Sequence, residues 1–215
     1  MTVFEQLSNN KGTVSSALGK ELARRVLSEN QINILSECID LACYEATAPA
    51  SKHIRAGAAK VVEIVAEERP ELVAPHLQRL LPALSVKEPQ TRWMIIRSMG
   101  FCAHLNQAAA QKAIAHAERY IAAKEGLCIA SSADLFLGDY GALSRQDALD
   151  VFPLLERSMG TVITNEQDWL LEALYKMFAN LSDAGQQRAI EFAKRWQDSS
   201  RKSTQRRAKK ILKLG

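Results

Sequence analysis

A triplet of residues at helical spacing recurs five times along the 215-residue chain, at intervals of 36 to 40 residues. In each copy an anchor is followed three positions later by a small or apolar residue, and four positions after that by an apolar or aromatic one. The copies are Arg55–Ala58–Val62, Arg92–Ile95–Met99, Cys128–Ser131–Leu135, Asp168–Leu171–Tyr175 and Gln205–Ala208–Leu212. A helix–turn–helix unit cannot bury its apolar face alone, but a stack of such units can. The recurrence therefore predicts an all-α stack of helix pairs.

Helical periodicity also fills the segments between the anchors, and strand signals are nearly absent. One apolar stripe at helical spacing consists of Val73, Leu77, Leu80, Leu81 and Leu84. The predicted helices are a short first helix and then 14–28, 31–47, 52–68, 71–84, 90–105, 107–123, 127–137, 144–159, 167–181, 183–197 and 203–214. Pro70 suits a first helical position, while Asn165 and Ser182 are predicted N-caps.

Two segments resemble a known repeat family. Residues 53–59 (His-Ile-Arg-Ala-Gly-Ala-Ala) resemble the start of a HEAT second helix, Thr91-Arg92 echoes it, and 70–84 resembles a HEAT first helix with its bending proline. The period is slightly shorter than the usual roughly 40–47 residues. The resemblance implies a right-handed α–α superhelix of the HEAT/armadillo type, with about six helix pairs. A chain of 215 residues is most simply one domain over 1–215, and we predict 1–28 as an N-terminal cap and 198–215 as a basic C-terminal capping helix.

The residues that usually carry catalysis or bind metals do not gather in the sequence. The histidines, His53, His76, His104 and His116, never stand four residues from another histidine or a cysteine. Residues 138–141 (Gly-Asp-Tyr-Gly) are interpreted as a helix stop, and Asp134 and Asp139 as a cap and a solvated face. The cysteines are interpreted as core residues in a reducing compartment: Cys38, Cys43, Cys102 and Cys128. We therefore predict no enzyme activity, no cofactor and no metal.

Two arginines and two tryptophans occupy matching positions of predicted second helices. Arg55 and Arg92 either bridge neighbouring repeats or offer hydrogen-bond donors to a ligand. Trp93 and Trp169 each follow an anchor by one residue. They either pack between repeats or act as binding anchors or base-stacking platforms.

The positive charge of the chain is concentrated at its C-terminal end. The net charge is +4, yet residues 194–215 hold nine Lys and Arg and only one acid, which leaves 19 basic and 23 acidic residues in 1–193. Lys202, Arg206, Lys209 and Lys213 fall within about 60° of one another on a helix. The candidate binding residues of this helix are Arg201, Lys202, Arg206, Arg207, Lys209, Lys210 and Lys213. The helix is either a polar cap of the stack or a contact for phosphates or an acidic partner.

Three functions remain open from the sequence. The first is a non-catalytic scaffold that binds another protein on the concave face of the solenoid. The alternative is nucleic-acid binding through the basic helix, with a resemblance to small HEAT-like DNA glycosylases that stops short of their Trp-Trp-Asp cluster. The third is membrane-surface association through the same helix. No apolar run approaches the roughly 18–20 residues of a membrane span, and a cytoplasmic location is expected.

Overall fold

Every regular element in the part of the chain that the structure describes is helical. The computed structural model describes residues 1–10, 17–45, 51–163 and 165–215, and these hold fourteen α-helices and three 3-10 helices. The predicted all-α class is therefore confirmed. The chain divides into two compact units, Met1–Ala113 and Ile114–Gly215. The single domain over 1–215 stays a prediction.

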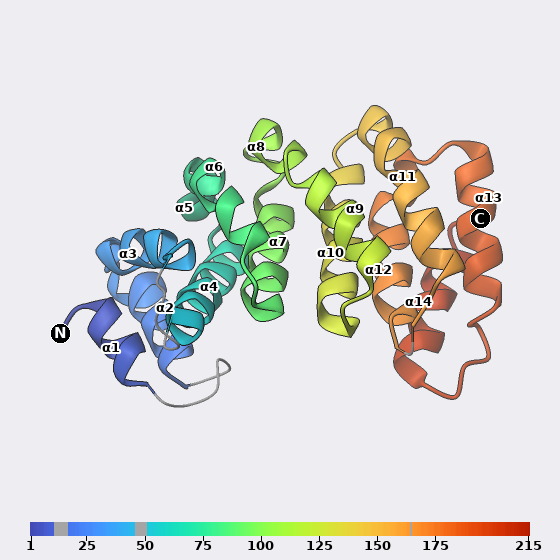
Figure 1. The fold of residues 1–215 in the computed structure, drawn as a ribbon. Coiled ribbons are helices and arrows are strands. Elements are labelled where there is room, and N and C mark those ends of the chain that lie inside the picture. Colours follow the sequence, from blue (N-terminus) through green and yellow to red (C-terminus); the bar gives the residue numbers. More distant parts are fainter. Residues whose placement is uncertain (11–16, 46–50, 164) are drawn as a thin grey trace. The chain divides into compact units, whose positions relative to one another are not determined.

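The first unit consists of three helix pairs and one additional short helix (Figure 1). Its helices are α1 (Val3–Asn9), α2 (Ala17–Glu29), α3 (Ile32–Ala42), α4 (Ser51–Glu68), α5 (Pro70–Val73), α6 (Leu77–Leu80), α7 (Pro89–Cys102) and α8 (Gln107–Gln111), with η1 (Ala74–His76) and η2 (Leu81–Ser85). The second helices of the pairs, α2, α4 and α7, pack side by side in chain order. This is the arrangement that the recurrent triplets predict.

Residues near the N-terminus form two helices, α1 and α2, that both pack on α4. The Thr2 side chain accepts a hydrogen bond from the Glu5 N–H, and the Glu5 carboxylate accepts one from the Thr2 N–H, so a capping box starts α1. Leu7 on α1 and Leu22 on α2 are buried, and both helices pack on α4. The predicted start of the second helix at residue 14 lies outside the described residues.

The second unit consists of three further pairs (Figure 1). Its helices are α9 (Ile114–Ala123), α10 (Leu127–Gly141), α11 (Arg145–Gly160), α12 (Gln167–Met177), α13 (Asp183–Lys194) and α14 (Lys202–Leu212), with η3 (Phe178–Asn180) after α12. The helix α10 is buried on nearly all sides, because it packs on α9, α11 and α12 at once. With the three pairs of the first unit, the prediction of about six pairs is confirmed.

Hydrogen bonds between distant side chains follow the repeat period. Arg55 donates to Glu88, Asn106 to the Ala74 carbonyl, and Lys112 to Gln78, across 33, 32 and 34 residues. In the second unit Asn180 donates to the Ala142 carbonyl across 38 residues, and Arg207 donates to Glu172 across 35. Each of these bonds joins one repeat to the next. Contact with nearest neighbours is what defines a solenoid physically.

Two predicted helices are broken in the structure. The segment 71–84 is divided into α5, η1, α6 and η2, because Pro75 and Pro82 lack an N–H and crowd the preceding turn. The segment 107–123 is divided into α8 and α9, and no Gly or Pro explains that break. Pro70 does occupy the first turn of α5, and Ser182 does cap α13 by accepting from the Gly185 N–H at 3.2 Å.

Two expectations about local geometry are wrong. Asn165 is not an N-cap: it has a φ of 74°, which asparagine tolerates better than most residues, and α12 begins after Glu166. The helix does not end before residues 138–141 as predicted, because α10 includes them and continues to Gly141. Gly138 is a contact point between helices, since a Cβ on it would lie 2.5 Å from the Ala173 Cα of α12.

Candidate functional site

The helix α14 separates an apolar face from a cationic one, as the sequence predicts. Thr204, Ala208 and Ile211 are buried against α12 and α13. On the opposite side Lys202, Arg206, Lys209 and Lys213 are exposed. We call these four residues the cationic stripe. No acidic residue lies on α14, so nothing on this helix neutralises the stripe.

Asp168 in the first turn of α12 anchors the start of α14. Its carboxylate is 5% exposed and accepts hydrogen bonds from the Thr204 hydroxyl, from Ser203 Oγ at 2.9 Å and from Arg201 Nη2 at 3.1 Å. Arg207 Nη1 lies 3.9 Å from the same carboxylate. Charge-assisted hydrogen bonds are about twice as strong as neutral ones. The candidates Arg201 and Arg207 are therefore used to hold two neighbouring repeats together.

Two half-exposed aromatic rings of α12 lie beside the stripe, each covered by a cation of α14. The Arg207 guanidinium lies 5.5 Å from the centre of the Trp169 ring, and Lys210 Nζ lies 4.9 Å from that of Tyr175. Both aromatic residues are 37% exposed. We call the cationic stripe together with Trp169, Tyr175 and Lys210 the α12–α14 surface. The sequence analysis used Tyr175 only as a core position, and its spacing of six residues from Trp169, about 120° apart around a helix, gave no sign that both rings would lie beside α14.

The cationic stripe is electrostatically unfavourable for its own helix. Lys202 and Arg206, Arg206 and Lys210, and Lys209 and Lys213 are like-charged neighbours four residues apart. Each such pair destabilises a helix by about 0.2–0.5 kcal/mol. Lys202 also lies at the positive end of the helix dipole. A bound anion would relieve this repulsion.

The candidate residues of the first unit lie on α4 and α7. Arg55 Nε donates to Glu88 Oε2 at 3.0 Å, and Arg55 Nη1 donates to the Tyr44 carbonyl at 2.6 Å. Arg55 therefore bridges neighbouring repeats, which was one of its two interpretations. Arg92 and Trp93 are half-buried, and Lys60 Nζ lies 5.8 Å from the centre of the Trp93 ring. Binding of a partner by Arg55, Arg92 and Trp93 stays a prediction.

Asp134 is not the helix cap or solvated residue that the sequence suggested. It is fully buried on α10, near the buried carboxylate of Glu166. Burial, followed by the Glu166 charge, raises the pKa of Asp134 well above its usual range, against the opposing influence of Ser158 and Lys124. Asp139 is half-buried and forms an ion pair with Lys176 of α12. The spacing of two aspartates could not reveal that Glu166 would fold next to the first of them.

Residues from three chain segments contact the Glu166 carboxylate. Lys124 Nζ, in the loop after α9, forms an ion pair with Glu166 and donates to Ser158 Oγ of α11 at 3.3 Å. Ser158 Oγ lies 3.4 Å from Glu166 Oε1, and the Ile163 N–H donates to Glu166 Oε2 at 2.8 Å. This Lys124–Ser158–Glu166 cluster escaped sequence reasoning, because its members are 8 to 42 residues apart.

The cysteines agree only partly with their interpretation as core residues. Cys38 and Cys102 are buried, and burial raises the pKa of Cys102 to about 12. Cys43 is half-buried and donates to the Arg79 carbonyl, while Cys128 is exposed at the start of α10. In the described ranges, His, Cys, Asp and Glu side chains form no group of three or more that could hold a metal ion.

The fold is that of an armadillo/HEAT-like helical repeat. A designed armadillo repeat protein has a TM-score of 0.59 and 12% identity to the chain, with 97% of this chain and 96% of that one covered. Two other engineered proteins are also similar. The first has a TM-score of 0.59 and 14% identity, and the match covers 91% of this chain and 95% of that one. The second has a TM-score of 0.64 and 12% identity, and the match covers 98% of this chain and 56% of that one. These likenesses confirm the predicted solenoid class.

The sequence itself matches no protein-family model. It also matches no curated protein. Across the described ranges, none of the helices combines the length and the apolar character that crossing a membrane requires.

Proposed function

We propose that this chain is a non-catalytic binding module that docks an acidic segment of a partner protein on the α12–α14 surface. The observation that carries the proposal is the cationic stripe, four exposed cations on α14 and its C-cap residue, a segment without an acidic residue. Armadillo-like repeats commonly bind proteins, which agrees with this class of partner. A reducing compartment such as the cytoplasm belongs to the proposal, since Cys38 and Cys102 are buried free thiols.

The aromatic rings favour a protein partner over single-stranded nucleic acid. Bases bind by stacking on open aromatic faces. Arg207 and Lys210 already lie over the Trp169 and Tyr175 rings, so a base would have to displace a cation from each. Acidic side chains need only the exposed ammonium and guanidinium groups of the stripe.

Nucleic-acid binding remains the second candidate, and the same stripe supports it. The distance from Lys202 to Lys213 along the helix axis is about 16 Å, at 1.5 Å per residue. A row of cations of this length can contact several phosphates of a duplex. Any link to HEAT-like DNA glycosylases belongs to this second candidate alone.

Fluorescence anisotropy across a salt series separates the two candidates. The probes are a labelled peptide of Glu and Ala with Glu at four-residue spacing, a labelled DNA duplex, and labelled single-stranded RNA. The test variant combines Lys202→Gln, Arg206→Gln, Lys209→Gln and Lys213→Gln. The matched control removes four exposed charges elsewhere: Lys20→Gln, Lys52→Gln, Lys87→Gln and Arg145→Gln.

We expect the wild type and the control to bind the acidic peptide, and the stripe variant to lose binding by at least about tenfold. Each cation contacting an anionic partner contributes up to about 1 kcal/mol at low salt. If duplex DNA binds more tightly than the peptide, and the stripe variant reduces the salt slope by about 3–4, the second candidate replaces the first. Equal losses in the stripe variant and the control would refute both, because they would reflect net charge alone.

A further inference from the structure

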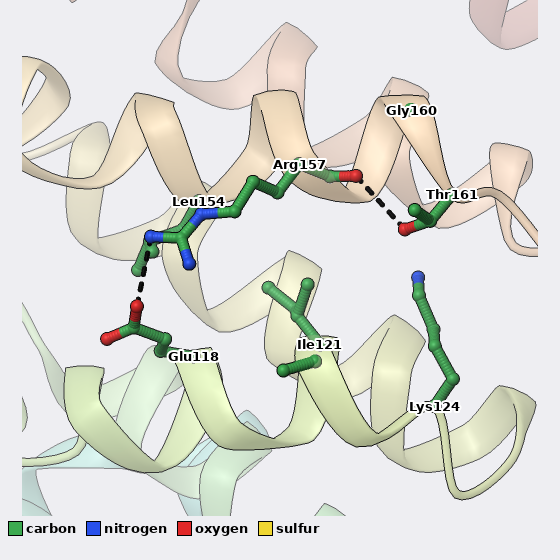
Figure 2. Close-up of a pocket in the computed structure, with 8 residues that line it drawn as sticks. Glu118, Ile121, Lys124, Leu154, Arg157, Gly160 and Thr161 are labelled. Atoms are coloured by element: carbon green, nitrogen blue, oxygen red, sulfur yellow. Dashed lines mark hydrogen bonds and ion pairs between the residues drawn. The ribbon is translucent and has the colours of Figure 1, made fainter.

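A pocket of about 370 Å³ lies between the first helices α9 and α11 of the second unit (Figure 2). Its size falls within the range of about 300–1,000 Å³ that is typical of small-molecule sites. It is separate from the α12–α14 surface, with which it shares no residue. Its chemistry is therefore independent of the proposed function.

The floor of the pocket is apolar, and each of its two ends holds a cation, one of which, Arg157, is paired with the lining residue Glu118. Ile121 of α9 and Leu154 of α11 are almost fully buried and form part of the lining. Arg157 stands at one end and Lys124 at the other, as Figure 2 shows. An apolar floor with a few polar groups at fixed places is the usual composition of a ligand site.

Both cations are held in place by interactions outside the floor. Arg157 Nη2 lies 2.9 Å from Glu118 Oε1 across the pocket, drawn as a dashed line in Figure 2. Lys124 is fixed from behind by the buried Glu166 carboxylate and by Ser158 Oγ. The Lys124 end of the pocket is thus positioned before any ligand arrives.

Hydrogen-bond donors at the ends outnumber the acceptors that they meet. An ammonium has three N–H donors and a guanidinium has five. Lys124 donates two hydrogen bonds, one to Glu166 and one to Ser158. Arg157 contacts Glu118 through one nitrogen, Nη2. The Thr161 hydroxyl at the rim donates to the Arg157 carbonyl at 3.0 Å. The donors that remain can bond an acceptor placed in the pocket, and an ionised acceptor makes the stronger bond.

We infer that this pocket binds a small monocarboxylate whose aliphatic chain lies on Ile121 and Leu154 and whose carboxylate accepts from Lys124. The Lys124 ammonium keeps its ion pair with Glu166 and adds the ligand as a third acceptor. The apolar chain displaces water from the floor, which supplies the hydrophobic part of the affinity.

Gly160 provides a way to close the pocket without disturbing the fold. It lines the pocket at the end of α11, and a Cβ added to it would have no atom within 4 Å. Gly160→Leu therefore adds a side chain at the rim of the hollow without a clash at its Cβ. Ala122→Phe fills the same pocket from the exposed surface of α9 and is an independent second variant. Since Gly160 also lines the neighbouring hollow beside α13, Glu191→Leu, which lines only that hollow, is the matched control.

The test follows the methyl resonance of Ile121 by NMR in the 215-residue chain, with isoleucine methyl labelling, during titration with hexanoate and with its neutral isostere hexanamide. We expect hexanoate to shift Ile121 with a dissociation constant in the millimolar range, and hexanamide to bind about tenfold more weakly. Both filling variants abolish the shift, and Glu191→Leu retains it.

Any of three results overturns the inference. Ile121 does not respond to hexanoate at its highest soluble concentration; its response survives in Gly160→Leu or Ala122→Phe; or hexanamide binds as well as hexanoate. Dispersed methyl spectra of each variant without ligand show whether it is folded, and two independent filling variants protect the test against the failure of one.

Discussion

At the scale of single residues, the carboxyl group of Asp134 contributes a dependence of stability on pH. It is completely buried, and it faces the Glu166 carboxylate, the Lys124 ammonium and the Ser158 hydroxyl. Lys124 is paired with Glu166, so no second cation in this cluster is available to Asp134. Burial and the Glu166 charge raise the pKa of Asp134, and the folded protein therefore keeps a proton that the unfolded chain has already lost.

Because the folded chain keeps this proton and the unfolded chain has lost it, the direction in which Asp134→Asn changes stability can be stated. The contribution of the protonated carboxyl is fully present below the unfolded pKa of about 3.9, and it is lost as the pH rises through the raised folded pKa. Asparagine imitates the neutral acid and cannot ionise. We expect the variant to gain stability relative to the wild type by about 1.4 kcal/mol per pH unit above about pH 4, until the folded group ionises and the difference becomes constant.

Urea unfolding of both proteins over a series of pH values from about 4 to about 8 measures this difference. Asp150→Asn, which removes an exposed carboxylate of α11, serves as the control. A constant difference between Asp134→Asn and the wild type across the whole series would contradict the assignment of a retained proton.

At the scale of helices, the contact between α10 and α12 depends on one glycine. A Cβ on Gly138 would lie 2.5 Å from the Ala173 Cα and 2.9 Å from the Ala173 carbonyl oxygen. The obstacle is backbone, which cannot rotate away as a side chain can. We expect Gly138→Ala to destabilise the protein by about 1–3 kcal/mol, because the two helices must move apart.

Gly160→Ala is the matched control, since it makes the same change at the end of a helix in open space. It should be neutral or stabilise the protein by up to about 1 kcal/mol, because alanine lowers the entropy of the unfolded chain. Denaturant midpoints of the two variants, measured side by side, check the pair. A loss of similar size in both would mean that helix propensity, and not the close approach to Ala173, determines the effect.

At the scale of the whole molecule, the sequence predicts the repeats well and the buried polar contacts poorly. Helix periodicity and the five triplets are local patterns, and they predicted the helix pairs and the exposed stripe of α14. The Asp134–Glu166 neighbourhood and the Lys124–Glu166 ion pair join residues 32 and 42 positions apart, so they depend on the register between repeats. Period alone does not fix that register to one residue. The hydrogen bonds by which Asp168 holds the start of α14 escaped prediction for the same reason.

A chain whose repeats contact their neighbours should also unfold locally. The hydrogen bonds Arg55–Glu88 and Arg207–Glu172 each span one repeat, and stability then becomes a sum of neighbouring contributions. Leu22 of α2 and Leu171 of α12 are fully buried, and truncation of such a leucine to alanine costs about 2–5 kcal/mol. We expect Leu22→Ala to accelerate amide hydrogen exchange in α1–α4 and to leave α12–α14 unchanged, while Leu171→Ala does the reverse. Hydrogen-exchange mass spectrometry with peptides from both units measures this. Equal acceleration along the chain in either variant would show that all repeats unfold as one cooperative block.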